Sequence, residues 1–132
     1  MFGKKKQPPI KSLIAHGTQI RGDLSFGDGL RIDGEVHGQL QATEGAPSLL
    51  VISETAKVWG EVRAGHVIVN GEVHGPVHAS ELLELQPKAR IHGDVSYQAL
   101  EMHQGATICG QLLPLGAGAQ DKPTLKLAAI GS

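Results

Sequence analysis

Hydrophobic and polar residues alternate along most of this chain in short segments, and one five-residue unit recurs six times. The unit is apolar-x-Gly-x-apolar. Within a copy the apolar side has a period of two, as Val36, Gly38 and Leu40 show against His37 and Gln39, which is typical of a β-strand with one buried face. The copies begin at Ile20, Val36, Val58, Val73, Ile91 and Ile108.

A second alternating segment precedes five of the six copies, and turn residues separate the two segments. These segments lie at residues 30–32, 50–52, 67–69, 83–85 and 100–102. Asp33-Gly34 and Asn70-Gly71 are short turns, and residues 86–89 and 103–106 are longer ones. Equivalent positions are 16, 22, 15, 18 and 17 residues apart, and the long step contains a loop insertion at residues 43–48. Each repeat is therefore predicted to consist of a strand, a turn, a second strand and a second turn.

Repeats of this size cannot bury their apolar face alone and are stable only when they stack on further copies. The pattern predicts an all-β, single-domain parallel β-helix of about six rungs, spaced about 4.8 Å apart. The repeated glycine falls on the inward side, where we expect a narrow corner or a positive φ. Pro76 should stand at a bend, because a proline inside a laddered strand loses a hydrogen bond.

Composition divides the chain into a repeat domain and two tails. Residues 1–12 form a basic leader containing Pro8 and Pro9, and residues 13–115 form the β-helix. Residues 116–132 lose the repeat and are rich in Gly, Ala and Lys. Both tails are expected to be flexible.

The N-terminal tail has the features of a peripheral membrane anchor. Phe2 is an apolar wedge beside three lysines, a pairing that suits an anionic inner leaflet. One tail would bind weakly, but many tails on one polymer would bind firmly by avidity. The alternative is a leader that only improves solubility. The predicted membrane-binding residues are Met1, Phe2, Lys4, Lys5 and Lys6.

Charge and cysteine content narrow the partners and the compartment. The net charge of −1 gives no reason to expect nucleic acid as a partner. No run approaches the roughly 18 apolar residues of a membrane span, and no secretory leader is present, so we expect a cytoplasmic protein. The single cysteine, Cys109, cannot form an internal disulfide and has outward strand parity.

Seven histidines suggest a metal site, but the repeat argues against one. His37, His74 and His92 share one outward position, and His74 and His92 should stand about 5 Å apart. Zinc needs three or four ligands, and outward carboxylates such as Glu35, Glu61, Glu72 and Asp94 are expected to be solvated. No catalytic or phosphate-binding motif is present, so we expect no catalytic, cofactor-binding or metal-binding residues. The shared position in the other rungs holds Arg21, Trp59 and Cys109.

The ends of a β-helix expose unpaired backbone and apolar interior unless a cap covers them. The sequence predicts no capping helix, so we expect end-to-end assembly into a homopolymer; tails folded back as caps would prevent it. Leu113 favours assembly, because its position is polar in every other rung. The expected contact residues are Ile20, Leu24 and Phe26 at the first rung, and Ile108, Leu112, Leu113 and Leu115 at the last.

The Gly-Glu-Val-His-Gly and Gly-Asp-Val rungs, with the opening Met-Phe-x-Lys-Lys-Lys, resemble the bactofilins, which are polymer-forming bacterial cytoskeletal proteins. The resemblance covers residues 1–6 and 13–115. It implies a right-handed β-helix with three faces that assembles end to end, without nucleotide, into non-polar filaments. It also implies a place on the inner face of the cytoplasmic membrane, and cell-wall enzymes or other cell-shape proteins as clients. Bactofilins often have an aromatic residue in the last rungs at the polymer contact, where this chain has Leu112 and Leu113.

Two other interpretations stay open. A left-handed β-helix enzyme, such as a hexapeptide acyltransferase or a carbonic-anhydrase-like trimer, needs steps in multiples of six, which steps of 16, 15 and 17 break. Such an enzyme would place a histidine in a cleft between subunits, for which His66 and His103 are the candidates. The third interpretation is an adaptor that binds another protein through its flat outer faces without polymerising.

Overall fold

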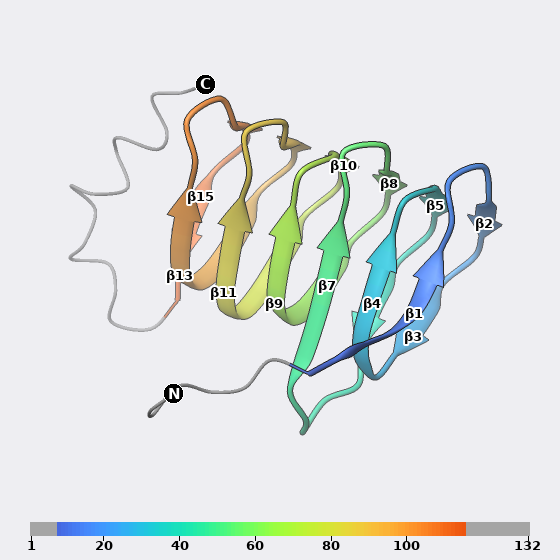
Figure 1. Cartoon of the computed structure of the whole chain (residues 1–132). Coiled ribbons are helices and arrows are strands. Elements are labelled where there is room, and N and C mark those ends of the chain that lie inside the picture. Colours follow the sequence, from blue (N-terminus) through green and yellow to red (C-terminus); the bar gives the residue numbers. More distant parts are fainter. Residues whose placement is uncertain (1–7, 116–132) are drawn as a thin grey trace.

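The strands coil around an aliphatic interior, one rung after another, from β1 to β15 (Figure 1). The computed structural model describes residues 8–115, and within that range it contains fifteen strands and no helix. Neighbouring strands pair in parallel, for example β10 with both β8 and β12. The coil is right-handed (Figure 1). The predicted parallel β-helix of six rungs is therefore confirmed.

Each rung has three sides, which we call A, B and C. Side A is a six-stranded sheet, and sides B and C belong to one nine-stranded sheet. Three long strands pass from side B of one rung to side C of the next: β9 (Val62–Val69), β11 (Val77–Leu85) and β13 (Val95–Met102). The side A strands are β2 (Gln19–Arg21), β5 (Glu35–His37), β8 (Lys57–Trp59), β10 (Glu72–His74), β12 (Arg90–His92) and β14 (Thr107–Cys109). The other strands are β3 (Leu24–Phe26), β6 (Leu40–Ala42) and β15 (Leu112–Pro114) on side B, and β1 (Ile10–Ile14), β4 (Asp28–Ile32) and β7 (Ser48–Ile52) on side C.

The core consists of apolar columns that run from rung to rung. The parallel register puts equivalent residues of successive rungs directly over one another, so a residue such as Val73 packs between Val58 and Ile91. Side chains in the interior rungs are closed off from solvent, and Val73 and Leu83 are both 0% exposed. β-branched and leucine side chains fill the narrow interior, which is why aromatic residues are scarce.

A column of glycines marks the corner between sides A and B. Gly60 has a φ of 149°, and a Cβ built on it would lie 2.1 Å from the carbonyl oxygen of Gly38 in the preceding rung. No side chain fits there, so glycine is what lets the rungs stack at this spacing. Pro76 follows Gly75 at the same corner, between β10 and β11, as predicted. The corner glycines are Gly22, Gly38, Gly60, Gly75, Gly93 and Gly110.

Carboxylates beside these glycines hold successive rungs together. Asp23 Oδ1 accepts a hydrogen bond from the backbone N–H of Gln39 at 2.9 Å, and Asp94 Oδ1 accepts one from the N–H of Gln111 at 2.9 Å. The sequence predicts that Asp94 is merely solvated. Its carboxylate instead joins two rungs at a corner where the strand ladder is interrupted.

The turn between sides C and A is organised around Asp33 in the second rung. Its carboxylate accepts hydrogen bonds from Ser53 Oγ at 2.5 Å and from Arg31 Nε at 2.9 Å. Its carbonyl oxygen accepts one from Thr55 Oγ1 at 2.8 Å. The hydrogen bond from Ser53 lowers the pKa of Asp33, with a smaller contribution from Arg31. These contacts join the turn to that of the third rung.

The N-terminal end of the repeat domain differs from the sequence-based boundary. Strand β1 begins at Ile10 and so overlaps the leader predicted for residues 1–12. The alternating pattern missed this strand because Ser12 occupies the position that Leu30 holds in the next rung. The insertion predicted at residues 43–48 is an exposed connection between β6 and β7, although Ser48 already belongs to β7. The tail predicted for residues 116–132 lies outside the described residues.

Candidate functional site

The described part of the solenoid ends in open sheet edges at both extremes. The N-terminal edge consists of β1, β2 and β3. The C-terminal edge consists of β14, β15 and residues 99–102 of β13. Within residues 8–115 each of these segments has a strand on one side only. Unpaired backbone groups of this kind bind further strands.

The apolar columns are incompletely covered at the same two edges. Six apolar side chains pack on the core but are only partly buried, and all six belong to the terminal rungs. One rung further in, the neighbours of the first three, Ile32, Val36 and Leu40, are 0% exposed. An added rung of apolar side chains would cover the terminal residues in the same way. They are Ile14, Ile20 and Leu24 at the N-terminal end, and Leu100, Met102 and Leu112 at the C-terminal end.

The sequence-predicted contact residues Ile20, Leu24 and Leu112 lie on these end surfaces. Phe26 and Ile108 also belong to the terminal rungs, but they are 9% and 3% exposed and contribute little free surface. Ile20, Leu24 and Leu112 therefore lie at the open edges, whereas Phe26 and Ile108 are buried in the core.

Leu113 and Leu115 lie at the rim of the C-terminal end. Leu113 points outward from side B and is 42% exposed, while Leu115 lines a groove on the side of the molecule. Ile14, Leu100 and Met102 were not among the contact residues predicted from the sequence. Their positions at the ends of core columns become evident only when the strands are placed in register.

Open, apolar ends suit a protein that binds further copies of itself, and comparison with known proteins decides the family. Residues 12–113 match the family described as "Bactofilin: Polymer-forming cytoskeletal". The chain belongs to the bactofilin family. This bactofilin is 26% identical over 111 residues to Bactofilin BacO of Myxococcus xanthus (strain DK1622), and the match covers 84% of this chain and 85% of that protein. No solved structure gives a significant match.

The right-handed coil of this bactofilin has the opposite hand to the left-handed enzymes considered above (Figure 1). The two histidines named for that alternative stand on either side of Glu84. His66 Nε2 is 3.9 Å from Glu84 Oε1, and His103 Nε2 is 3.7 Å from Glu84 Oε2. Both distances exceed those of a formed hydrogen bond. Family and handedness therefore both favour the structural interpretation.

Side A carries a column of four stacked rings, which we call the ring column: His37, Trp59, His74 and His92. Successive ring centroids are 4.4, 5.7 and 4.6 Å apart, and the planes of neighbouring rings lie within 11° of each other. The predicted proximity of His74 and His92 is confirmed. His74 Nε2 lies 2.5 Å from Glu72 Oε2, and this hydrogen bond lowers the pKa of Glu72.

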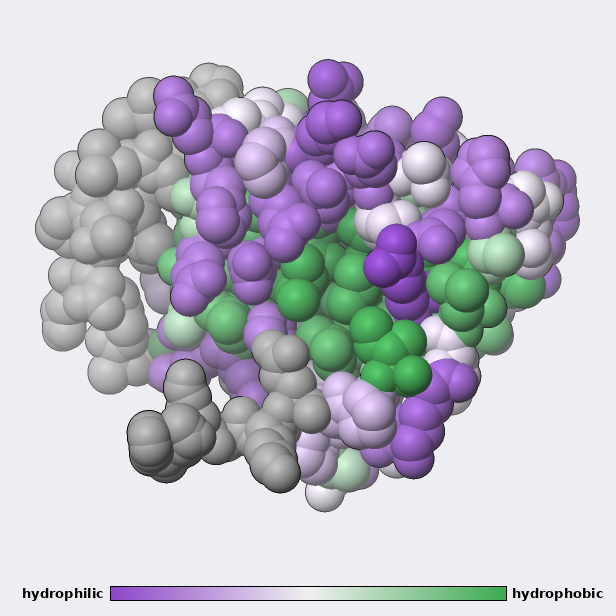
Figure 2. Space-filling model, in the orientation of Figure 1, coloured by the Kyte–Doolittle hydropathy of each residue, from purple (hydrophilic) through white to green (hydrophobic). Residues whose placement is uncertain are grey.

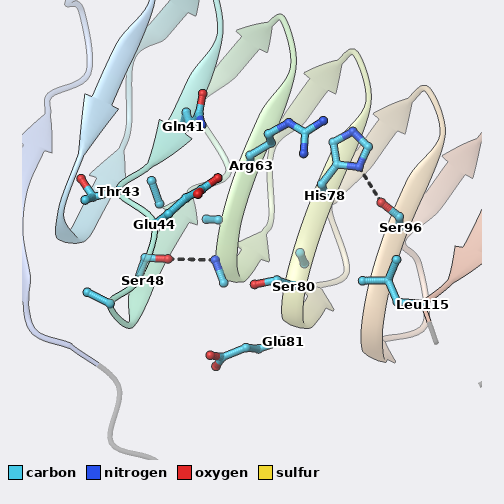
Figure 3. Close-up of a pocket in the computed structure, with 16 residues that line it drawn as sticks. Gln41, Thr43, Glu44, Ser48, Arg63, His78, Ser80, Glu81, Ser96 and Leu115 are labelled. Carbon is cyan, nitrogen blue, oxygen red and sulfur yellow. Dashed lines mark hydrogen bonds between the residues drawn. The ribbon is translucent and has the colours of Figure 1, made fainter. Parts of the chain in front are cut away.

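A groove with a volume of about 400 Å³ lies beside the insertion loop, along the corner between sides B and C (Figure 3). Its lining is mixed: apolar residues such as Ala42 and Ala79 lie beside charged residues, which include Arg63, Glu44 and Glu81 (Figure 3). His78 Nδ1 lies 2.6 Å from Ser96 Oγ, so part of the wall is already hydrogen-bonded. The groove is a shallow surface of mixed polarity on the side of the rod.

Side C has a mixed outer surface, with an apolar patch in the middle of the face and polar residues around it (Figure 2). The outward column is apolar in the first, third and fourth rungs and acidic in the last two. Its members are Leu13, Arg31, Val51, Ile68, Glu84 and Glu101. Leu13 is the most exposed of the apolar three, at 58%.

The predicted membrane-binding residues Met1, Phe2, Lys4, Lys5 and Lys6 lie outside the described residues. Between residues 8 and 115 the structure contains no helix that is long and apolar enough to cross a membrane.

Proposed function

We propose that this bactofilin assembles end to end, without nucleotide, into non-polar filaments on the inner face of the cytoplasmic membrane, where it localises cell-wall or cell-shape proteins. The observation that carries the proposal is the incomplete cover of the core columns at both ends of the rod. The sequence match to a polymer-forming family supports it.

A second copy stacked on an end would supply both a partner for the edge strands and an apolar cover for the exposed core residues. Its edge strands would pair with the open edges, and its apolar residues would cover side chains such as Leu24 and Leu112. Full burial of a side chain of this kind stabilises by about 1.5–3 kcal/mol. The stabilisation from several such side chains, together with strand pairing, is comparable to the free-energy cost of association, which is about 4–15 kcal/mol. The contact itself drives assembly, so no nucleotide is required.

Filaments joined through like ends have no polarity, as the family resemblance implies. The N-terminal tail supplies the membrane contact in this proposal, with Phe2 entering the interface and the lysines binding anionic headgroups. Each lysine contributes about 1 kcal/mol near such a surface. A single tail therefore binds transiently, and a filament with many tails binds firmly.

Assembly through the ends leaves the sides of the rod free for clients. The ring column on side A, the mixed groove and the apolar patch on side C differ in chemistry, so they offer separate surfaces to partner proteins. Repetition along the filament would present each surface many times at fixed spacing.

The test is assembly of the purified full-length protein, with no nucleotide or metal added, followed by negative-stain electron microscopy and sedimentation. We expect thin filaments of uniform width. Leu112→Arg places a charge on the end surface and should abolish them, because the charge would be buried without a partner. Leu113→Arg, at the exposed rim, should weaken them without threatening the fold.

The matched control is Gln41→Arg, which places the same charge in the outward column of Leu113 but in an interior rung. This variant should assemble like the natural protein. Far-ultraviolet circular dichroism checks that each variant keeps its β-structure. Normal filaments from both leucine variants would refute the end contact, and compact trimers from the natural protein would revive the enzyme alternative.

A further inference from the structure

Two outward columns run along side A and bring metal-ligating side chains from two rungs together. In the fourth rung Glu72 and His74 lie two residues apart on β10, so both point outward. The parallel register pairs His74 with His92 on β12 of the fifth rung. The rung geometry thus gathers one carboxylate and two imidazoles on one outer surface.

The donor atoms of these three side chains are close together. His74 Nε2 lies 2.5 Å from Glu72 Oε2, and the rings of His74 and His92 are 4.6 Å apart at their centroids. One Glu72 oxygen and one nitrogen from each imidazole all lie within 4.8 Å of one another. Among residues 8–115 this is the one group of three or more such side chains that could hold a metal ion.

We propose that Glu72, His74 and His92 bind one Zn²⁺ ion on the outer surface of side A. Two imidazoles and a carboxylate form a ligand set that zinc accepts, with Zn–N and Zn–O distances of about 2.0–2.2 Å. Tetrahedral ligands at that distance are about 3.4 Å apart, so donor atoms as far apart as 4.8 Å would need to close by about 1.4 Å, whereas His74 Nε2 and Glu72 Oε2, at 2.5 Å, need to open by about 0.9 Å. A fourth coordination position remains for water or for a donor from another molecule.

The side chains are free enough to make this adjustment. The side chains of His74 and Glu72 are 33% and 34% exposed, and His92 is an exposed residue. Turning the imidazoles out of their stack disturbs the ring column but no core residue. Lys57 and Arg90 flank Glu72 in the neighbouring rungs and oppose a cation. We therefore expect exchangeable binding that is weaker than in a buried four-ligand zinc site.

The second rung holds the same Glu-Val-His sequence without the third ligand, and so provides an internal control. His37 Nε2 lies 3.4 Å from Glu35 Oε1, which repeats the pairing of the fourth rung. The register sets His37 between Arg21 and Trp59, neither of which ligates zinc. Of the two rungs with this Glu-Val-His sequence, only the fourth has a histidine in the same position of an adjoining rung.

The experiment uses untagged full-length protein, stripped with EDTA and titrated with ZnCl₂ in a calorimeter. We expect saturable binding of one ion per chain. His92→Ala and Glu72→Gln should each weaken binding by at least about tenfold, since even loss of a group behind a ligand costs that much. His37→Ala should bind zinc like the natural protein. Leu112→Arg should also bind zinc normally, which separates this proposal from that of assembly.

Substitution with Co²⁺ identifies the ligands by visible absorption. We expect bands of a nitrogen and oxygen site that disappear in His92→Ala. A sulfur-to-cobalt band that is lost in Cys109→Ser would overturn the assignment of Glu72. Absence of saturable binding would refute the site, as would equal weakening by His37→Ala, or loss of binding in His103→Ala, which would move the ion to Glu84.

Discussion

Single residues determine how closely the rungs can approach at the corner between sides A and B. Four of the corner glycines, Gly38, Gly60, Gly75 and Gly93, combine a positive φ with a carbonyl oxygen of the preceding rung at the position that a Cβ atom would occupy. The sequence pattern placed these glycines at an inward corner, which is confirmed. It could not reveal the opposing carbonyl, because that contact depends on the rung spacing.

Gly60→Ala should therefore destabilise the fold severely. The new Cβ would lie 2.1 Å from the Gly38 carbonyl oxygen on a backbone with a φ of 149°. We expect the free energy of unfolding to fall by about 3 kcal/mol or more, measured by urea denaturation.

Gly27→Ala is the matched control, because its Cβ would meet nothing nearer than Thr43 Oγ1 at 3.9 Å. That change should cost less than about 1 kcal/mol. Similar losses in the two variants would show that the corner is not the constraint.

Strands and turns form the next scale, and here the sequence was most informative. Alternation of apolar residues located the strands of copies two to six, and the Asp-Gly and Asn-Gly pairs located the short turns. The alternation did not locate β1, because Ser12 interrupts the apolar pattern there. It also missed the grouping of Glu72 with two histidines, because ligands were counted along one outward column and Glu72 stands in the neighbouring one.

The Asp33 turn gives the fold a pH-dependent element. Because the folded pKa of Asp33 is lowered, its ionised form adds stability that is fully present above the unfolded pKa of about 3.9. This stability is lost as the pH falls through the lower, folded pKa. Asp33→Asn should lower the free energy of unfolding by about 1 kcal/mol at pH 7 and make little difference at the acid limit.

Urea denaturation at a series of pH values measures this difference. Glu54→Gln is the control, since Glu54 makes an exposed ion pair with Lys88 and should matter little at any pH. A difference between Asp33→Asn and the natural protein that stayed constant down to the lowest pH would contradict the electrostatic explanation.

At the scale of the whole molecule, apolar ends and a basic tail should respond differently to salt. Raising the salt from 0.15 M to 1 M shortens the screening length from about 8 Å to about 3 Å. Filaments should persist, because burial of apolar side chains at the ends does not depend on charge. Their co-sedimentation with vesicles rich in anionic lipid should fall, because the lysine contacts are screened.

Replacement of Lys4, Lys5 and Lys6 by Gln should reduce vesicle binding at low salt and leave the filaments intact. Vesicles of neutral lipid provide the baseline for both proteins. Filaments that dissolve in 1 M salt would show that the contact between copies depends on charged groups elsewhere on the rod.

The loop between β6 and β7 has a practical use for imaging. Its residues 43–47 are all exposed, and the chain leaves and rejoins the coil there without interrupting a core column. Exposed loop tips of this kind tolerate inserted domains. A fluorescent protein spliced into this loop would leave both ends of the rod and both tails in their natural form, so labelled molecules could report where filaments form in living cells.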